Sequence, residues 1–170
     1  MKVPLRFQVT EYDCGTVSLL NAFSYLFERE EIPAELVRAV NKYTLDSYDD
    51  KGNAGAGGTS KRAIKKLTNW IEEYADKKNF GIVCDRLIGQ NVNFKNIYNC
   101  IKNNGVVFIR CWQECQHYVI ITKINKRNAY IFDSYYLPIE EYKNDKMVKI
   151  IFNKPFEYNR RVKINRIFGT

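Results

Sequence analysis

The sequence predicts an α+β fold in which a helical N-terminal part packs on a C-terminal antiparallel β-sheet. Apolar residues recur at helical spacing through most of the first two thirds of the chain. The last third instead contains short runs rich in β-branched and aromatic residues, separated by polar turns. A chain of 170 residues, 45% of them hydrophobic, suits one domain. We expect a helical lobe of about residues 1–104 and a sheet lobe of about residues 105–170.

Four helices are expected in the first part. The first covers residues 14–30, where apolar side chains recur at steps of three, three, three and one and form one broad face. The second covers residues 33–43, with Pro33 in a first turn that does not need its N–H. The third is expected to begin after a capping hydroxyl at Thr59 or Ser60.

The segments between the helices are expected to be loops or short strands. Residues 46–58 form a glycine-rich loop that lacks the Gly-Lys-Ser/Thr ending of a phosphate-binding loop. Residues 81–87 are expected to form a short strand. Asn91 or Asn93 is expected to cap the fourth helix, and Gly105 to end it in a left-handed conformation.

The last third contains the expected strands. A short Asn-Lys-Arg-Asn turn joins the second strand to the third, so these two are expected to form an antiparallel hairpin. The five expected strands cover residues 106–112, 117–124, 129–133, 147–152 and about 158–168.

The composition indicates where the protein is located and whether its cysteines are reduced. No apolar run reaches the roughly 18 residues that a membrane-spanning helix needs, and the N-terminus lacks the apolar core of a signal peptide. We therefore expect a cytoplasmic protein. Five cysteines, an odd number without an export signal, predict reduced thiols. Cys84 and Cys100 lie in apolar-periodic segments and are expected in the core.

The net charge of +8 is unevenly distributed. Residues 1–50 carry 5 basic and 9 acidic side chains, whereas residues 143–170 carry 8 and 2. This basic C-terminal region is either a solvated surface or a surface for an anionic partner, and a peptide exporter or a membrane surface is a candidate. The aromatic residues are expected to fill the core and to line a peptide groove, so nucleic acid is not the expected partner.

Cys14 has the features of a nucleophile. It begins the first expected helix, and a helix N-terminus stabilises a thiolate through its unpaired N–H groups and its dipole. Gly15 leaves room for the backbone to approach a substrate carbonyl, and the N–H of Cys14 can donate to an oxyanion. Asp13, Gly15 and Tyr118 flank the expected catalytic groups and are expected to contact the substrate.

His117 is the one histidine of the chain and the expected base for the thiol. It begins the second strand of the expected hairpin, and Asp133 ends the third. The hairpin brings the start of one strand beside the end of the other, so Asp133 can orient the imidazole toward the thiol. Gln8, six residues before Cys14, can donate a second hydrogen bond to the oxyanion.

Two short motifs carry a family resemblance. The stretch from Gln8 to Cys14, Q-V-T-E-Y-D-C, resembles the glutamine-to-cysteine block of papain-like peptidases. The Asp13-Cys14-Gly15 triplet resembles the bacteriocin-processing, double-glycine leader peptidases found at the N-termini of peptide-exporting ABC transporters.

Three later segments are similar to the same family in the same order. The segment G-T-S-K-R-A-I-K-K-L from Gly58 is similar to the start of its middle helix. The segments H-Y-V-I-I from His117 and I-F-D-S from Ile131 are similar to its histidine and aspartate strands. The resemblance spans about residues 5–137.

The resemblance implies a papain-like fold and a triad of Cys14, His117 and Asp133, with Gln8 as the oxyanion donor. It also implies a cysteine peptidase that uses an acyl-enzyme and no metal or cofactor, with a small precursor peptide cut after a Gly-Gly leader as the candidate substrate. The family often has Asp-Pro where this chain has Asp133-Ser134. Neither transporter spans nor a nucleotide-binding domain follow, so we expect a stand-alone form.

Other functions use the same residues. Cys111, Cys115 and His117 could bind a metal, but zinc needs a fourth ligand, and this use would remove the base from Cys14. A disulfide between Cys111 and Cys115 is a further alternative. An acyltransferase or ligase could use the same triad, and a peptide-binding module could keep the fold without catalysis. A host-directed effector or toxin could use the same chemistry elsewhere.

Overall fold

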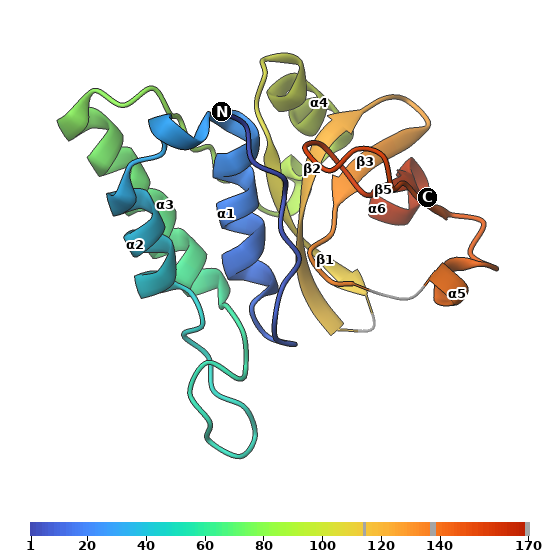
Figure 1. The fold of residues 1–170 in the computed structure, drawn as a ribbon, viewed down its shortest axis with the longest axis horizontal. Coiled ribbons are helices and arrows are strands. Elements are labelled where there is room, and N and C mark those ends of the chain that lie inside the picture. The colour runs from blue at the N-terminus through green and yellow to red at the C-terminus, as the bar shows by residue number, and fades with distance from the viewer. Residues whose placement is uncertain (114, 137–138, 169–170) are drawn as a thin grey trace.

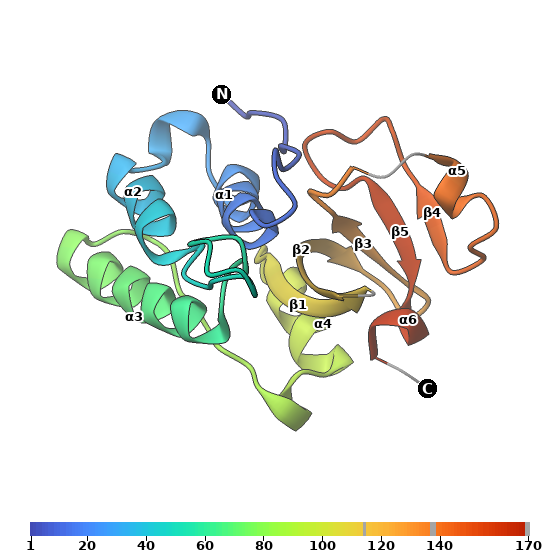
Figure 2. The ribbon, with the colours of Figure 1, turned by 90° about the horizontal axis from the view of Figure 1, so that it is seen from below.

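The computed structural model describes residues 1–113, 115–136 and 139–168, and their side chains except those of residues 112, 113 and 115. The fold is mixed α+β, as the sequence predicts. Helices stand on both sides of a five-stranded antiparallel sheet with the strand order β1-β2-β3-β5-β4 (Figures 1 and 2). No helix of the described residues combines the length and the hydropathy that crossing a membrane requires.

The elements have the following bounds. The helices are α1 (Cys14–Leu26), α2 (Ala34–Tyr43), α3 (Lys61–Lys78), α4 (Phe94–Lys102), α5 (Ile139–Tyr142) and α6 (Ile164–Phe168). Two short 3-10 turns, η1 and η2, cover Arg29–Glu31 and Gly89–Asn91. The strands are β1 (Val107–Gln113), β2 (Cys115–Ile124), β3 (Asn128–Phe132), β4 (Val148–Ile150) and β5 (Arg160–Lys163).

Helix α1 lies between the α2–α3 pair and the sheet, as both ribbon views show (Figures 1 and 2). It is therefore buried on more than its apolar face, and its polar side chains need partners inside the protein. Ser18 donates to the backbone oxygen of Tyr118 at 3.0 Å, which ties α1 to β2. Asn21 exchanges two hydrogen bonds with the backbone of Arg6, which ties α1 to the N-terminal segment.

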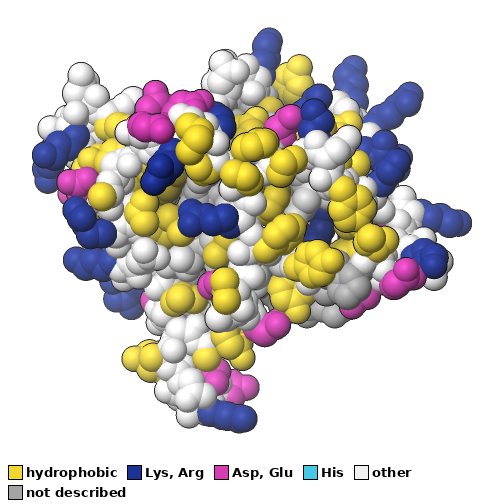
Figure 3. All heavy atoms as spheres, in the orientation of Figure 1, with side chains coloured by type: hydrophobic (Ala, Val, Ile, Leu, Met, Phe, Trp, Pro, Cys, Tyr) yellow, Lys and Arg dark blue, Asp and Glu magenta, His cyan; other side chains and the backbone are white. Residues whose placement is uncertain are grey.

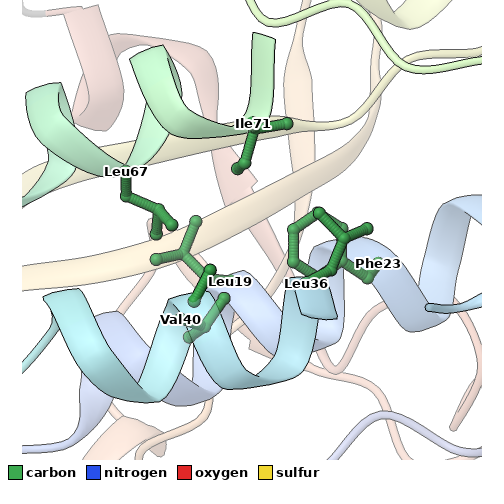
Figure 4. Packing of buried hydrophobic residues seen from close by; sticks show 7 residues of the cluster. Leu19, Phe23, Leu36, Val40, Leu67 and Ile71 are labelled. Carbon is green, nitrogen blue, oxygen red and sulfur yellow. The ribbon is translucent and has the colours of Figure 1, made fainter. Parts of the chain in front are cut away.

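One hydrophobic cluster joins the three helices of this layer (Figure 4). Successive helical turns supply its side chains, so each helix buries one stripe. Burying each Leu, Ile, Val or Phe side chain of the cluster is worth about 1.5–3 kcal/mol relative to exposure. The cluster comprises Leu19, Phe23, Leu36, Ala39, Val40, Leu67 and Ile71.

A second cluster holds the sheet to α4. Ile97 of α4 packs with Val119 and Ile121 of β2 and with Val162 of β5. In hydrophobic packing, α4 therefore belongs with the sheet, although it precedes the expected lobe boundary at residue 104.

The structure confirms several local predictions. Ser60 caps α3 by accepting from the N–H of Ala63, and Asn93 caps α4 by accepting from that of Asn96. The β2–β3 hairpin forms, with Ile120 opposite Phe132.

Other local predictions were wrong. The first helix ends at Leu26, because Phe27 turns to an extended conformation. Pro33 precedes α2 as its N-cap instead of lying in its first turn. Residues 81–87 form no strand, because none of the described strands pairs with them. The run from residue 158 to residue 168 divides into β5 and α6.

Gly105 has a different role from the expected one. Asn104 adopts the left-handed conformation that ends α4, with φ of 59°. A Cβ on residue 105 would lie 2.6 Å from Sγ of Cys100 and 2.8 Å from its backbone oxygen. Glycine is therefore needed here for a close approach and not for its conformation.

Candidate active site

Cys14 is the first residue of α1 and is 8% exposed. Its place at the helix N-terminus favours the thiolate through the helix dipole. The carboxylate of Asp13 does not cap α1. It accepts from the N–H and hydroxyl of Thr10 at 3.1 and 2.9 Å, and from the N–H of Val9 at 3.3 Å. Asp13 therefore closes the loop that precedes the thiol, and its predicted contact with substrate stays a prediction.

Gly15 lies where α1 comes closest to its neighbours. A Cβ here would lie 2.8 Å from Cβ of Thr59 and 3.2 Å from the ring of Tyr118. A larger residue would therefore push α1, with Cys14, away from β2. The need for a small side chain was expected for substrate access, and the structure adds this packing reason.

Tyr118 lies in the interior and is 4% exposed. Its ring stacks on Phe108 at 4.8 Å between centroids, and the guanidinium of Arg110 lies 5.7 Å from its ring. Its hydroxyl is buried without a hydrogen-bond partner among the described residues. Tyr118 thus packs against Gly15, and its predicted contact with substrate stays a prediction.

His117 lies on β2, 7% exposed, between the thiol and a carboxylate. Its Nε2 is 2.7 Å from Oδ1 of Asp133, and Cys14 is its other hydrogen-bond partner. Because Nε2 bonds to Asp133, Nδ1 is the nitrogen left for the hydrogen bond with Cys14. Burial lowers the pKa of His117, but the hydrogen bonds and charges of Asp133 and Cys14 outweigh it and raise the pKa to about 9. His117 is therefore an imidazolium at neutral pH, and a cation beside a cysteine is the kind of partner that an activated thiol needs.

Asp133 directly follows β3 and is completely buried. Oδ1 accepts from the backbone N–H of Tyr135 at 2.9 Å as well as bonding to His117. Oδ2 accepts from Nη1 of Arg160, a residue that is 4% exposed. The side chain of Asn159 bonds to both backbone groups of Asp133, at 2.9 and 2.7 Å. The carboxylate is thus fixed by its side chain and by its backbone.

Sequence reasoning missed Arg160 and Asn159. Both belong to the basic C-terminal region, which was interpreted as a charged surface. They reach Asp133 because β5 pairs with β3, with Arg160 opposite Ile131. One signal could have indicated them: a carboxylate in an apolar strand needs a buried cation, and arginine suits that role best.

Gln8 is oriented by the residue that follows Asp133. The hydroxyl of Ser134 donates to Oε1 of Gln8 at 2.9 Å, and the N–H of Gln8 donates to the backbone oxygen of Ser134 at 2.9 Å. Nε2 of Gln8 donates one hydrogen to the backbone oxygen of Thr10 at 2.8 Å, which leaves its second hydrogen for a substrate oxygen. Ser134 thus helps to set the direction of this amide.

Exposed apolar side chains adjoin Gln8 in sequence and in space. Phe7, Val9 and Tyr12 are 45%, 91% and 46% exposed, and Tyr136 is 67% exposed. The rings of Phe7 and Tyr136 meet edge to face at 5.6 Å. In Figure 3, hydrophobic side chains extend across the middle of one face, and Lys and Arg gather toward its upper right edge. An apolar surface of this kind suits a polypeptide ligand.

The basic side chains of the sheet form a row. Lys123 lies opposite Tyr130, Tyr130 opposite Arg161, and Arg161 opposite Lys149. Like charges on neighbouring strands repel, so this row favours an anionic partner. The exporter or membrane expected for the basic region stays a prediction.

The alternative metal site gains no support from the described residues, which contain no group of three His, Cys, Asp or Glu placed to hold a metal. Sγ of Cys111 contacts the backbone oxygen of His117 at 3.5 Å. The side chain of Cys115 lies outside the described ones, so its pairing or metal binding stays untested. Cys14, Cys84 and Cys100 are free thiols, as the sequence predicts.

Comparison with known proteins adds no relatives. No protein-family model matches the chain, and no curated protein or solved structure matches it either. The chemistry of the site therefore rests on its own residues.

Proposed function

We propose that this chain is a papain-like cysteine peptidase, similar to the double-glycine leader peptidases. The observation that carries the proposal is His117, held between the thiol of Cys14 and the buried carboxylate of Asp133. A helix N-terminus, a base and a base-orienting carboxylate are the parts that an activated thiol needs. The exposed apolar surface beside Gln8 supports a peptide as the substrate class.

The reaction follows from these positions. The thiolate of Cys14 attacks the scissile carbonyl carbon, and the oxyanion accepts from the N–H of Cys14 and from Nε2 of Gln8. His117 protonates the leaving amine as the C–N bond breaks, which leaves a thioester and a neutral imidazole. His117 then takes a proton from water, the hydroxide adds to the thioester, and the C–S bond breaks to restore the thiolate.

Alkylation of the thiols tests the activated nucleophile. Iodoacetamide at about pH 6 should label Cys14 at least about tenfold faster than Cys84 or Cys100. Burial, with Glu72 and Asp85, raises the pKa of Cys84 to about 11, and burial raises that of Cys100, so both serve as internal references. A His117→Ala variant should lose the difference. Equal labelling of all three thiols, or an unchanged rate without His117, would disprove the activated pair.

Cleavage tests the reaction itself. A peptide library that includes precursors with a Gly-Gly leader should be cut by the wild-type chain and left intact by Cys14→Ala. Binding of a library peptide without cleavage by the wild type would identify a binding module instead. Transfer of the acyl group to an added amine, in place of water, would identify a ligase.

A further inference from the structure

Halfway through the proposed reaction, the carboxylate of Asp133 loses the positive charge of its partner His117. The thiol is then a thioester, and His117 must be neutral to take a proton from water. The carboxylate of Asp133, which is completely buried, no longer faces an imidazolium at that stage. A buried carboxylate without a counter-charge is strongly disfavoured, so His117 would tend to stay protonated and inactive.

Arg160 supplies a charge that does not depend on the proton of His117. Its Nη1 donates to Oδ2 of Asp133, and its Nη2 donates to the backbone oxygen of Tyr135 at 2.6 Å. Its guanidinium lies 4.9 Å from the ring of Tyr142, and arginine keeps its charge throughout the physiological pH range. Arg160 thus neutralises the carboxylate in both halves of the reaction.

We propose that Arg160 is a positioning residue that acts as the permanent counter-ion of Asp133, and that it allows His117 to become neutral for hydrolysis of the acyl-enzyme. This inference rests on the proposed peptidase function. It assigns a role to the C-terminal segment, which the resemblance to known peptidases does not reach.

Whether loss of Arg160 raises or lowers the pKa of His117 depends on which other groups hold the carboxylate of Asp133. Without Arg160, Oδ1 of Asp133 would still accept from Tyr135, and Asn159 would still bind its backbone. The carboxylate would therefore stay beside His117 with its charge uncompensated. An uncompensated anion holds the proton of His117 more tightly, so loss of Arg160 should raise the proton affinity of the imidazole.

Several titratable groups of the described residues surround this pair, and they include Cys111 of β1, whose Sγ contacts the backbone oxygen of His117 at 3.5 Å. Cys14 of α1 and Asp133 after β3 face His117, and the ring of Tyr135 meets it edge on at 6.3 Å. Burial raises the pKa of Tyr142, the phenol on the far side of Arg160, so it remains neutral. Arg161 is adjacent in sequence but pairs across the sheet with Tyr130 and Lys149, which makes it a matched control.

The first experiment is an NMR titration of the imidazole. His117 is the one histidine of the chain, so histidine-selective labelling gives a single signal. The titration uses a Cys14→Ala background, which lacks the thiolate as the acyl-enzyme does. Arg160→Met should raise the pKa of His117 by about one unit, and Arg161→Met should leave it unchanged. An unchanged or lowered pKa in Arg160→Met would overturn the proposal.

Two further variants separate charge from hydrogen bonding. Arg160→Gln can still donate to Asp133 but has no charge, so it should raise the pKa of His117 as Arg160→Met does. Arg160→Lys keeps the charge and should bring the pKa back toward the wild-type value. Circular dichroism checks that each variant is folded, and if Arg160→Met unfolds, the Gln and Lys variants decide. A wild-type pKa in folded Arg160→Gln would reject the counter-ion role.

The second experiment measures the two halves of the reaction. A Gly-Gly p-nitrophenyl ester acylates Cys14 with a visible burst, and mass spectrometry counts the adduct. Arg160→Gln should slow release of the acyl group about tenfold while the burst rate changes less, so the adduct accumulates. Equal slowing of both steps would overturn the proposal. If the wild-type chain forms no adduct, the peptidase function fails, and the NMR titration still tests Arg160 by itself.

Discussion

The two halves of the candidate site are built in different ways. The thiol half, Gln8 to Gly15, is one short stretch that ends in the first turn of α1. The imidazole half joins His117 of β2, Asp133 just after β3 and Arg160 of β5, through two ion pairs that share the completely buried carboxylate of Asp133. From this difference we expect chemistry and stability to be more separable in the first half than in the second.

The largest expected effect lies in the thiol half and should be confined to chemistry. Cys14→Ala removes the nucleophile, so peptide cleavage should fall by about 10⁴-fold or more. The free energy of unfolding, measured with urea, should change less than in a variant of Asp133, because His117 loses its thiol partner but keeps its buried carboxylate. A large loss of stability would show that the two halves are equally coupled to the fold.

Asp133→Asn should lose both activity and stability. The amide cannot neutralise Arg160, and an uncompensated buried charge costs about 3–5 kcal/mol. Cleavage should fall by about 10⁴-fold, because the imidazole loses the partner that fixes its tautomer. Urea unfolding and cleavage rates measure the two effects. If Asp133→Asn is as stable as Cys14→Ala, the contrast between the halves is wrong.

The coupling should also appear in the pH dependence of stability. The pKa of His117 is raised from 6.5 to about 9 in the folded chain. The folded state therefore gains stability below pH 6.5, on the order of 3 kcal/mol, and loses it as the pH rises through about 9. His117→Gln lacks this titration. The difference in unfolding free energy between wild type and His117→Gln should shrink from about pH 6 to about pH 10. A constant difference would contradict the raised pKa.

The smallest effect should come from the contact between the halves. Ser134→Ala removes the hydrogen bond that orients the amide of Gln8, so kcat should fall about tenfold. Gln8→Ala removes the oxyanion donor itself and should cost more, about 10²-fold. The measurement is kcat of Ser134→Ala and of Gln8→Ala, and the two losses are compared as a ratio. An equal loss in both variants would mean that Ser134 contributes everything that Gln8 does, and an unchanged Ser134→Ala would mean that Thr10 alone orients the amide.

The sequence predicted the thiol half more completely than the imidazole half, and the reason is physical. A helix start and the residues before it are local, so Cys14 and its neighbours could be placed from spacing. The hairpin placed His117 near Asp133, because a short turn fixes the pairing of its strands. Arg160 could not be placed, because β5 inserts next to β3 while β4, which precedes it in sequence, lies at the edge. Sequence order does not specify that arrangement.

Smaller errors have the same origin. Residues 81–87 have the composition of a strand, but a strand also needs an edge to pair with, and tertiary structure decides that. Gly105 had the expected position for a helix end, yet Asn104 took the left-handed conformation and left Gly105 to meet Cys100. Local patterns indicated that the chain turns there but not which neighbour it meets.

The contact between Ser134 and Gln8 has a consequence for the time at which the site forms. It joins residues 126 positions apart, and Asn159 and Arg160 contact Asp133 from positions still later in the sequence. During synthesis, which proceeds from the N-terminus, Cys14 is made well before these supporting groups. The complete site described here therefore cannot exist on a growing chain until residue 160 has left the ribosome.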